Sequence, residues 1–323
     1  MNIDKSHLNT TKNLLAFSAG IDSTALFFLL IEESIPFDIA IVDYNQRVQS
    51  KDEIIYATQL AHKYNKKCYI SNYPTATKFA EKEARDYRYK FFDKIIEENH
   101  YATLFTAHQL NDKLEWFLMQ FTKGAGLSEL IGMEEISIRN GYKVIKPLLE
   151  YSKNELQLYL DTNKIKYFID KSNYDEKYKR NYFRHNFSDE LLMKFQQGIR
   201  NSFEYLEKDK ISLLKDSEEI VMQDLTIFTF NGDLNIGLRL IDKDLKRRGI
   251  IISNATRIEI KTKKELVLSH KIALSIYKDK IYIAPVLNVS MPKIFKEKCR
   301  IEKIPKNIRP YIFKLFEEKV FTF

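Results

Sequence analysis

A segment of small and hydroxyl-bearing residues at positions 17–26, FSAGIDSTAL, has the composition of a phosphate-binding turn. An apolar run precedes it and a helical pattern follows, so the free N–H groups of a helix start would face one point, where small residues let the backbone approach a phosphate. Asp22 is the only carboxylate of the segment and is the expected ligand of Mg²⁺ bridged to phosphate oxygens. The predicted nucleotide-binding residues of this turn are Ser18, Ala19, Gly20, Ile21, Asp22 and Ser23.

Two common phosphate motifs do not describe this segment. It lacks the Gly-Lys-Ser/Thr ending of a Walker A loop, and its single glycine excludes the Rossmann fingerprint. Taken alone, its spacing also fits an ordinary strand–helix turn in which Asp22 caps the helix.

Three further chemically active side chains occur at helical spacing. His108 and Asp112 are four residues apart and Glu115 follows three residues later, so a helix would bring them to one face. Acidic residues on a helix usually belong to its solvent-exposed face and have no catalytic role. At the end of a strand beside a nucleotide turn, the same set favours a functional site.

Arginines are grouped in two places. Arg85 and Arg88 would share a helix face and clamp phosphates, although Arg85 could instead pair at the surface with Glu81. Arg180 and Arg184 offer two guanidinium groups suited to a leaving phosphate or a nucleic-acid backbone, and the alternative is a plain basic loop.

The elements that would position these residues alternate between strand and helix. Apolar runs predict strands at 12–17, 37–43, 67–70 and 102–107, and helical spacing predicts helices at 24–33, 52–64, 79–98 and 111–121. This order is typical of an α/β fold with a doubly wound, mostly parallel, Rossmann-like sheet whose functional loops follow the strands. Asp43, at the end of the second strand, would lie near adenine or ribose, and Arg47 would contact phosphate or the acceptor.

The remainder of the chain predicts a second domain. Ser152 and Glu155 form a capping box that opens a helix to about residue 163, and helical spacing continues over 191–214. Short β-rich runs then mix with basic helical pieces, as in a smaller α+β domain. We place the domains at 1–210 and 211–323.

Composition narrows the classes of protein. The 323 residues carry 52 Lys and Arg against 44 Asp and Glu, and the net charge of +8 favours a polyanionic partner, although many cytoplasmic proteins are equally basic. The longest apolar run, Ala25–Ile31, is far short of the ~20 residues of a membrane span. Two cysteines, Cys68 and Cys299, exclude a disulfide framework and a four-thiolate zinc site. We expect a cytoplasmic protein without a membrane partner.

The turn resembles the SGGxDS loop of the N-type ATP pyrophosphatases, with Ala19 in place of one glycine. Further segments over about residues 14–190 are similar, in order, to the tRNA(Ile)-lysidine synthetases. Residues 106–115 resemble the family's TAHHxDDQxE, with departures at Gln109, Asn111 and Lys113. The other similar segments are 84–89 (ARxxRY), 124–133 (GxG…LxGM), 146–149 (RPLL) and 170–185 (DxSN…RNxxRH).

This resemblance implies an adenine nucleotide alpha hydrolase-like fold and an ATP- and Mg²⁺-dependent ligase. Such an enzyme joins free L-lysine to carbon 2 of the wobble cytidine of tRNA(Ile) with a CAU anticodon, through an adenylated intermediate. The implied catalytic residues are Asp22, Arg85, Asp112 and Arg184, with His108 binding nucleotide and Asp112 near the amine of lysine. At most a homodimer is implied.

The resemblance also implies that the C-terminal domain binds tRNA. The candidate backbone contacts are Arg247, Arg248, Lys261, Lys263, Lys264, Lys296, Lys298, Arg300 and Lys303. Many of these could merely solvate a surface.

Three alternatives remain at this stage. A tRNA thiolase would share the adenylation step but needs cysteines in a pattern such as CxxC. GMP or NAD synthetase would explain only the phosphate turn. An RNA-binding protein with a degenerate nucleotide site is motivated by Ala19, Gln109 and Asn111.

Overall fold

A computed structural model describes residues 1, 3, 12–44, 49–74, 81–169, 179–215 and 217–323. It divides into two compact units, Met1–Leu206 and Glu207–Phe323. Every helix within these ranges is too short or too polar to cross a bilayer.

The first unit is built on a six-stranded sheet in the order β3-β2-β1-β4-β6-β5, parallel except for β5. Its strands are β1 (Asn13–Ala16), β2 (Asp38–Asp43), β3 (Cys68–Asn72), β4 (Thr103–Phe105), β5 (Ile136–Arg139) and β6 (Tyr142–Ile145). Its helices are α1 (Ile21–Glu32), α2 (Gln49–Lys63), α3 (Glu81–Asn99), α4 (Leu110–Phe121), α5 (Leu127–Leu130), α6 (Lys153–Thr162), α7 (Lys179–Phe183) and a π-helical turn (Arg184–Ser188). α8 (Asp189–Leu214) begins in this unit. The expected α/β class is confirmed.

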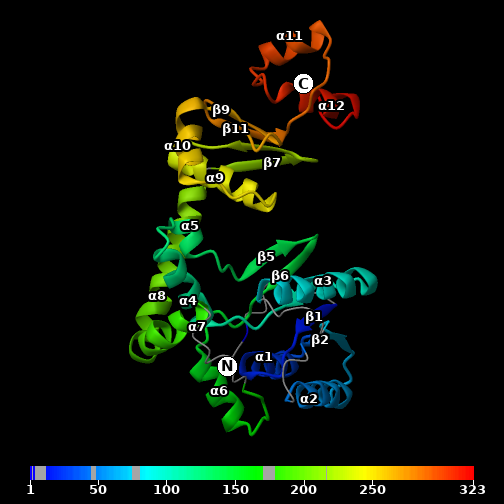
Figure 1. The fold of residues 1–323 in the computed structure, drawn as a ribbon, viewed down its shortest axis with the longest axis vertical. Coiled ribbons are helices and arrows are strands. Elements are labelled where there is room, and N and C mark those ends of the chain that lie inside the picture. The colour runs from blue at the N-terminus through cyan, green and yellow to red at the C-terminus, as the bar shows by residue number, and fades with distance from the viewer. Residues whose placement is uncertain (2, 4–11, 45–48, 75–80, 170–178, 216) are drawn as a thin grey trace. The chain divides into compact units, whose positions relative to one another are not determined.

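Helices cover both faces of this sheet. Successive residues of a strand face opposite sides, so neighbouring residues of one strand pack against different helices. Leu15 of β1 belongs to a buried cluster that includes side chains of α1, α2 and α6. Its neighbour Leu14 belongs to another cluster, with Phe92 and Ile96 of α3. Figure 1 shows α3 on the opposite side of β1 and β2 from α1 and α2.

The sequence analysis missed the hairpin of β5 and β6. Asn140 and Gly141 join these strands with φ of 44° and 85°, and Arg139 pairs with Tyr142. Asn-Gly is the typical pair for such a two-residue turn because both positions need positive φ. The capping box at Ser152 and Glu155 is confirmed, and α6 begins directly after it.

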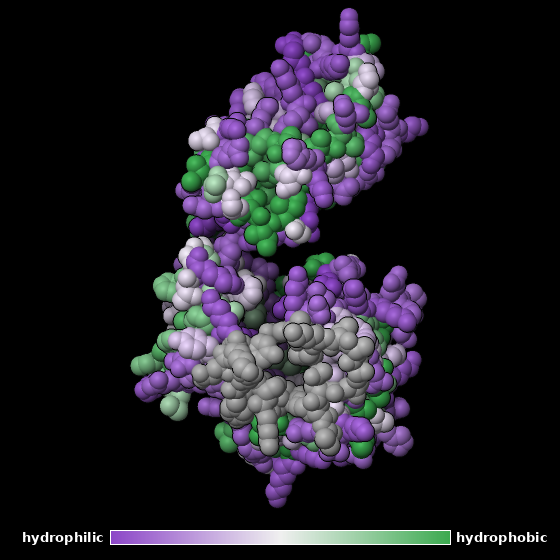
Figure 2. All heavy atoms as spheres, in the orientation of Figure 1, coloured by the Kyte–Doolittle hydropathy of each residue, from purple (hydrophilic) through white to green (hydrophobic). Residues whose placement is uncertain are grey.

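The second unit is an antiparallel sheet in the order β7-β8-β11-β10-β9, with helices on both faces. Its strands are β7 (Glu218–Met222), β8 (Leu225–Thr229), β9 (Glu265–Leu268), β10 (Ile272–Tyr277) and β11 (Lys280–Pro285). Its helices are α9 (Leu234–Arg247), α10 (Asn254–Lys263), α11 (Lys293–Ile301) and α12 (Arg309–Glu317). On the face that Figure 2 shows, hydrophobic residues gather in one area of this unit, with hydrophilic residues around it.

Candidate active site

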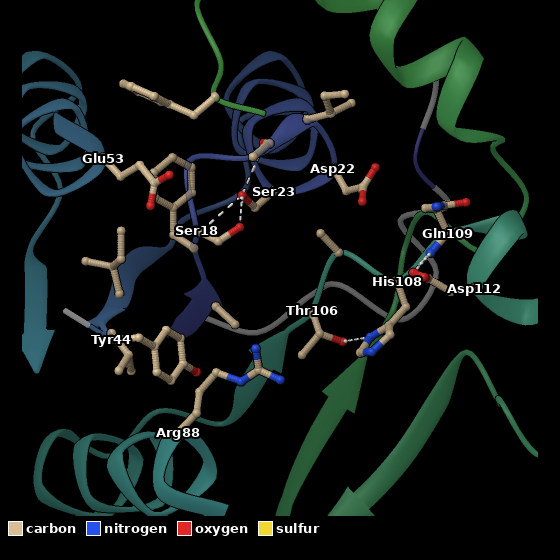
Figure 3. Close-up of a pocket in the computed structure, with 18 of the residues that line it drawn as sticks. Ser18, Asp22, Ser23, Tyr44, Glu53, Arg88, Thr106, His108, Gln109 and Asp112 are labelled. Atoms are coloured by element: carbon tan, nitrogen blue, oxygen red, sulfur yellow. Dashed lines mark hydrogen bonds between the residues drawn. The ribbon is translucent and has the colours of Figure 1, made fainter. Parts of the chain in front are cut away.

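A cavity of about 690 Å³ lies where the carboxyl ends of β1, β2 and β4 meet the first residues of α1, α4 and α6. This is the edge at which ligands bind in doubly wound folds. Figure 3 labels side chains around the cavity from α1, α2, α3 and α4 and from the segments that follow β1, β2 and β4. The predicted residues that line it are Ser18, Gly20, Ile21, Asp22, Ser23, Asp43, His108, Asp112 and Arg184.

The turn after β1 is braced by its own side chains. The Ser18 N–H donates to Ser23 Oγ at 3.1 Å, and the two hydroxyl oxygens are 3.0 Å apart (Figure 3). Ala19 is buried with a φ of 59°, and its carbonyl accepts a hydrogen bond from the Phe168 N–H at 2.9 Å. The left-handed backbone that favours glycine is therefore held by an alanine, at a cost of roughly 1–2 kcal/mol.

The start of α1 is open to an anion. Gly20 is its N-cap residue, and no side chain of the described residues caps the helix. The first N–H groups of α1 and the positive end of its dipole therefore face the cavity without a side-chain acceptor.

Asp22 is the most unusual group of the site. Its Oδ1 is buried without a hydrogen-bond partner among the described residues. The Asp22 pKa is raised to about 7: burial and then the charge of Asp112 raise it, and the charges of Lys153 and Arg184 partly offset them. A buried, unpartnered carboxylate oxygen beside an anion-binding helix start fits a Mg²⁺ ion, which is commonly held by one or two carboxylates and substrate phosphates.

A network of two acids and two arginines lies beside Asp22. Arg180 donates through Nε to Glu115 at 2.9 Å and also pairs with Asp112. Arg184 donates through Nε to Glu115 at 2.7 Å and lies 3.6 Å from Asp112. The two arginines thus bridge both acids of α4 from α7 and the π-helical turn.

The two acids of this network differ in their protonation. The pKa of Asp112 is lowered, because the charges of Arg180 and Arg184 and the hydrogen bond from the Gln109 N–H outweigh its burial. The pKa of Glu115 is raised, chiefly by burial and then by the charge of Asp112. Asp112 also accepts the Gln109 N–H at 3.1 Å (Figure 3). Its role toward lysine stays a prediction.

His108 is neutral at physiological pH. Its Nδ1 lies 3.0 Å from the Thr106 hydroxyl (Figure 3), and burial lowers its pKa to about 4. It therefore offers the cavity a polar ring rather than a cation.

Residues of segment 106–115 that differ from the family pattern have hydrogen-bond or ion-pair partners in the structure. Asn111 donates through Nδ2 to Asp189 at 2.9 Å and accepts the Lys153 N–H at 3.1 Å. A carboxylate at position 111 would face that of Asp189, so the amide suits this neighbour. The ammonium of the buried Lys113 lies 3.5 Å from Glu150.

The arginine of α3 that lines the cavity is Arg88, which lies near Tyr44 in Figure 3. Arg85 is exposed, with its guanidinium 5.6 Å from the centre of the Tyr89 ring, and it is not part of the cavity lining. The catalytic role of Arg85 stays a prediction.

Tyr44 and Lys153 are polar cavity residues that the sequence analysis did not single out. Tyr44 follows Asp43 at the strand end, and Lys153 directly follows the recognised cap Ser152. Their places after a predicted strand and a predicted helix start were signals that could have found them. Arg47 and residues 170–173 lie outside the described residues.

The candidate tRNA-contacting residues of the second unit differ in the neighbours they have. Arg247 pairs with Asp244 and Glu219, and Arg248 pairs with Asp244. Four others have a neighbour within their unit: Lys261 with Asn235, Lys263 with Glu259, Arg300 with Glu297, and Lys298 over the Phe323 ring. Lys264, Lys296 and Lys303 are exposed.

Comparison with known proteins gives one consistent result. Residues 2–191 match a family model described as a PP-loop domain. A tRNA(Ile)-lysidine synthase of Wolinella succinogenes is 42% identical over 96% of this chain and 95% of its own length. Those of Campylobacter jejuni and Helicobacter pylori are 44% and 40% identical, over 95% and 97% of this chain and 94% and 93% of their own lengths.

Among solved structures, a U34-tRNA thiolase of Methanococcus maripaludis has a similar fold. The TM-score is 0.51 at 19% identity, over 64% of this chain and 74% of that chain.

Proposed function

The chain belongs to the PP-loop family and, within it, to the tRNA(Ile)-lysidine synthases, and from this we propose that its cavity binds ATP and joins free L-lysine to the wobble cytidine of a CAU-anticodon tRNA(Ile). In this reaction the cytosine carbonyl oxygen attacks the α-phosphate and pyrophosphate leaves. The lysine amine then attacks carbon 2 of the ring and AMP leaves.

One observation carries this proposal beyond the family relationship: an uncapped helix start and the unpartnered Asp22 oxygen line the same cavity. Asp22 would hold Mg²⁺, which supplies positive charge at the phosphates when bound. The N–H groups of α1 orient the phosphates. Both contributions act where negative charge gathers during adenylation.

The arginines of the cavity suit the second step. Arg180 and Arg184 are held by Asp112 and Glu115 in fixed orientations, so their guanidinium groups need little reorganisation when AMP leaves. His108 stays neutral beside them, which avoids adding a charge to lysine's path. The lysine amine must be neutral to attack, and entry into this cavity favours its neutral form.

For the second unit we propose tRNA binding, with the catalytic and tRNA-binding domains divided near residue 210. Exposed lysines of this unit, including Lys264, Lys296 and Lys303, support this role because they can contact phosphates without breaking buried pairs. The reaction would take place in the cytoplasm, and the enzyme would act as a monomer or a homodimer.

The direct test is transfer of labelled free lysine, with Mg-ATP, to a tRNA(Ile) transcript bearing a CAU anticodon. The elongator tRNA(Met) transcript, which has the same anticodon, is the control. Label in the first transcript alone is the expected result. AMP release without label in either would contradict the choice of lysine, and no AMP release would contradict the ligase.

The thiolase alternative is not favoured. The relatives named tRNA(Ile)-lysidine synthase match nearly the whole chain, whereas the similarity to the thiolase structure concerns the fold alone.

A further inference from the structure

Lys153 is a cation of the cavity that neither the family segments nor the predicted site included. It is the first residue of α6, it is half-buried, and it lines the same cavity as Asp22. Its charge is close enough to act on the Asp22 carboxylate.

The other cations of the cavity are already paired. Arg180 and Arg184 bind Asp112 and Glu115, and Arg88 interacts with the Tyr44 hydroxyl. Within the described part of the chain, no side chain accepts a hydrogen bond or an ion pair from the Lys153 ammonium. A half-buried ammonium at the cavity wall without a protein acceptor is available to an anion that enters the cavity.

The backbone at Lys153 is fixed from three sides. The Lys153 N–H donates to the Asn111 side chain of α4 at 3.1 Å. The preceding residue, Ser152, accepts and donates in a capping box with Glu155. Arg200 of α8 binds that Glu155 carboxylate and donates to the Glu150 carbonyl at 2.7 Å. An ammonium on so constrained a helix start loses little further backbone freedom when it binds.

We propose that the Lys153 ammonium binds phosphate oxygens of ATP opposite the N-terminus of α1, as a further substrate-contacting residue of the ligation reaction. The proposal rests on the proposed function, because it assigns a role within the same site. The nucleotide brings several negative charges into a cavity in which Arg180 and Arg184 are already balanced by acids. A lysine is a flexible point charge suited to such oxygens.

The test measures binding of α,β-methylene-ATP with Mg²⁺ to the full chain by calorimetry. Lys153→Met should weaken binding about tenfold or more, as expected for a lost charge-assisted hydrogen bond. Lys153→Arg, which keeps the charge, should stay within about threefold of the unchanged protein. Lys164→Met changes an exposed lysine just after α6 and should bind normally.

Kinetics then separates nucleotide binding from a structural defect. With Lys153→Met we expect KM for ATP to rise while KM for lysine, measured at saturating ATP, is unchanged. The melting temperature should also stay nearly the same, since none of the described side chains accepts a hydrogen bond from the ammonium.

Two results would overturn the proposal. Normal analogue binding by Lys153→Met would exclude a phosphate contact. A rise confined to KM for lysine would assign the ammonium to the carboxylate of the amino acid instead. Because analogue binding needs neither tRNA nor lysine, failure of the lysine-transfer assay would contradict the proposed function and leave this test intact.

Discussion

The two units each contain a buried acid held by two arginines, yet their surroundings differ. In the first unit, Glu115 is fully buried and is bound by Arg180 and Arg184. In the second, Asp244 is 3% exposed and is bound by Arg247 and Arg248, with the Thr226 hydroxyl donating at 2.9 Å. The local chemistry of the two networks is nearly the same.

The two networks differ because only the first lies beside a cavity that contains a carboxylate oxygen without a hydrogen-bond partner among the described residues. The arginines at Glu115 line the 690 Å³ cavity, and Asp22 with its unpartnered oxygen lies within reach of the Arg184 charge. The residues at Asp244 do not line that cavity, and both carboxylate oxygens have donors. A buried ion pair is weak evidence for function or stability by itself. The unsatisfied neighbour is the informative feature.

The largest expected effect comes from Asp22→Asn. We expect lysine transfer to fall about a thousandfold, because the ligand for Mg²⁺ and its charge at the phosphates are lost. The melting temperature should not fall, since a buried carboxylate with a raised pKa is replaced by a neutral amide.

Asp244→Asn is its counterpart in the second unit. It should lower the melting temperature and leave the specific activity of the folded enzyme nearly unchanged. Equal losses of activity in the two variants, assayed side by side, would show that the two networks do not differ in function.

Arg184→Met and Arg248→Met should have similar costs in stability but different effects on activity. Each removes one partner of a buried acid, and we expect about 3 kcal/mol of lost stability in the affected unit. Arg184→Met should also reduce lysine transfer about a hundredfold, whereas Arg248→Met should stay within about threefold.

The single tryptophan, Trp116 of α4, reports the first unit alone. In urea, Arg184→Met should lower the midpoint of its fluorescence change. Arg248→Met should leave that midpoint in place and shift only the circular dichroism transition. A tryptophan shift in Arg248→Met would mean that the two networks are not independent.

Asn111→Asp should have an intermediate effect. It puts a second carboxylate opposite Asp189, so we expect about 1–2 kcal/mol of destabilisation and roughly tenfold lower transfer, because α8 loses its bond to α4 while the Lys153 N–H keeps its acceptor. Adding Asp189→Asn reverses the pair and should restore most of both quantities. A double-mutant cycle with no coupling would rule out this contact.

The smallest effect concerns pH. The folded pKa of His108 is about 4, below the ~6.5 of an unfolded histidine. The unfolded chain therefore binds the proton first, and stability falls progressively as the pH decreases from 6.5 to 4. Above pH 6.5 this contribution is absent.

His108→Gln should remove this part of the pH dependence in unfolding curves measured between pH 7 and 4.5. The exposed His62 of α2 supplies the control, His62→Gln. An identical pH dependence in His108→Gln and the unchanged protein would contradict the buried, neutral assignment.

Patterns of neighbouring residues in the sequence determined much of the fold of this protein. Strand–helix alternation predicted the parallel sheet, and the small residues after β1 predicted the phosphate turn. The capping box at Ser152 fixed the start of α6. These features depend on neighbours within a few residues, so the sequence alone can express them.

Tertiary structure decided which side chains meet. Arg85 and Arg88 are three residues apart, and only the packing of α3 on the sheet turned Arg88 into the cavity. Arg180 reaches Glu115 across 65 positions of sequence. Arg247 and Arg248, expected on a tRNA-binding surface, instead bind Asp244 of their own helix. Helix phase and long-range packing set these contacts, and residue spacing does not encode them. For the same reason only the assembled cavity distinguished Lys153, whose ammonium has no acceptor among the described side chains, from the paired arginines around it.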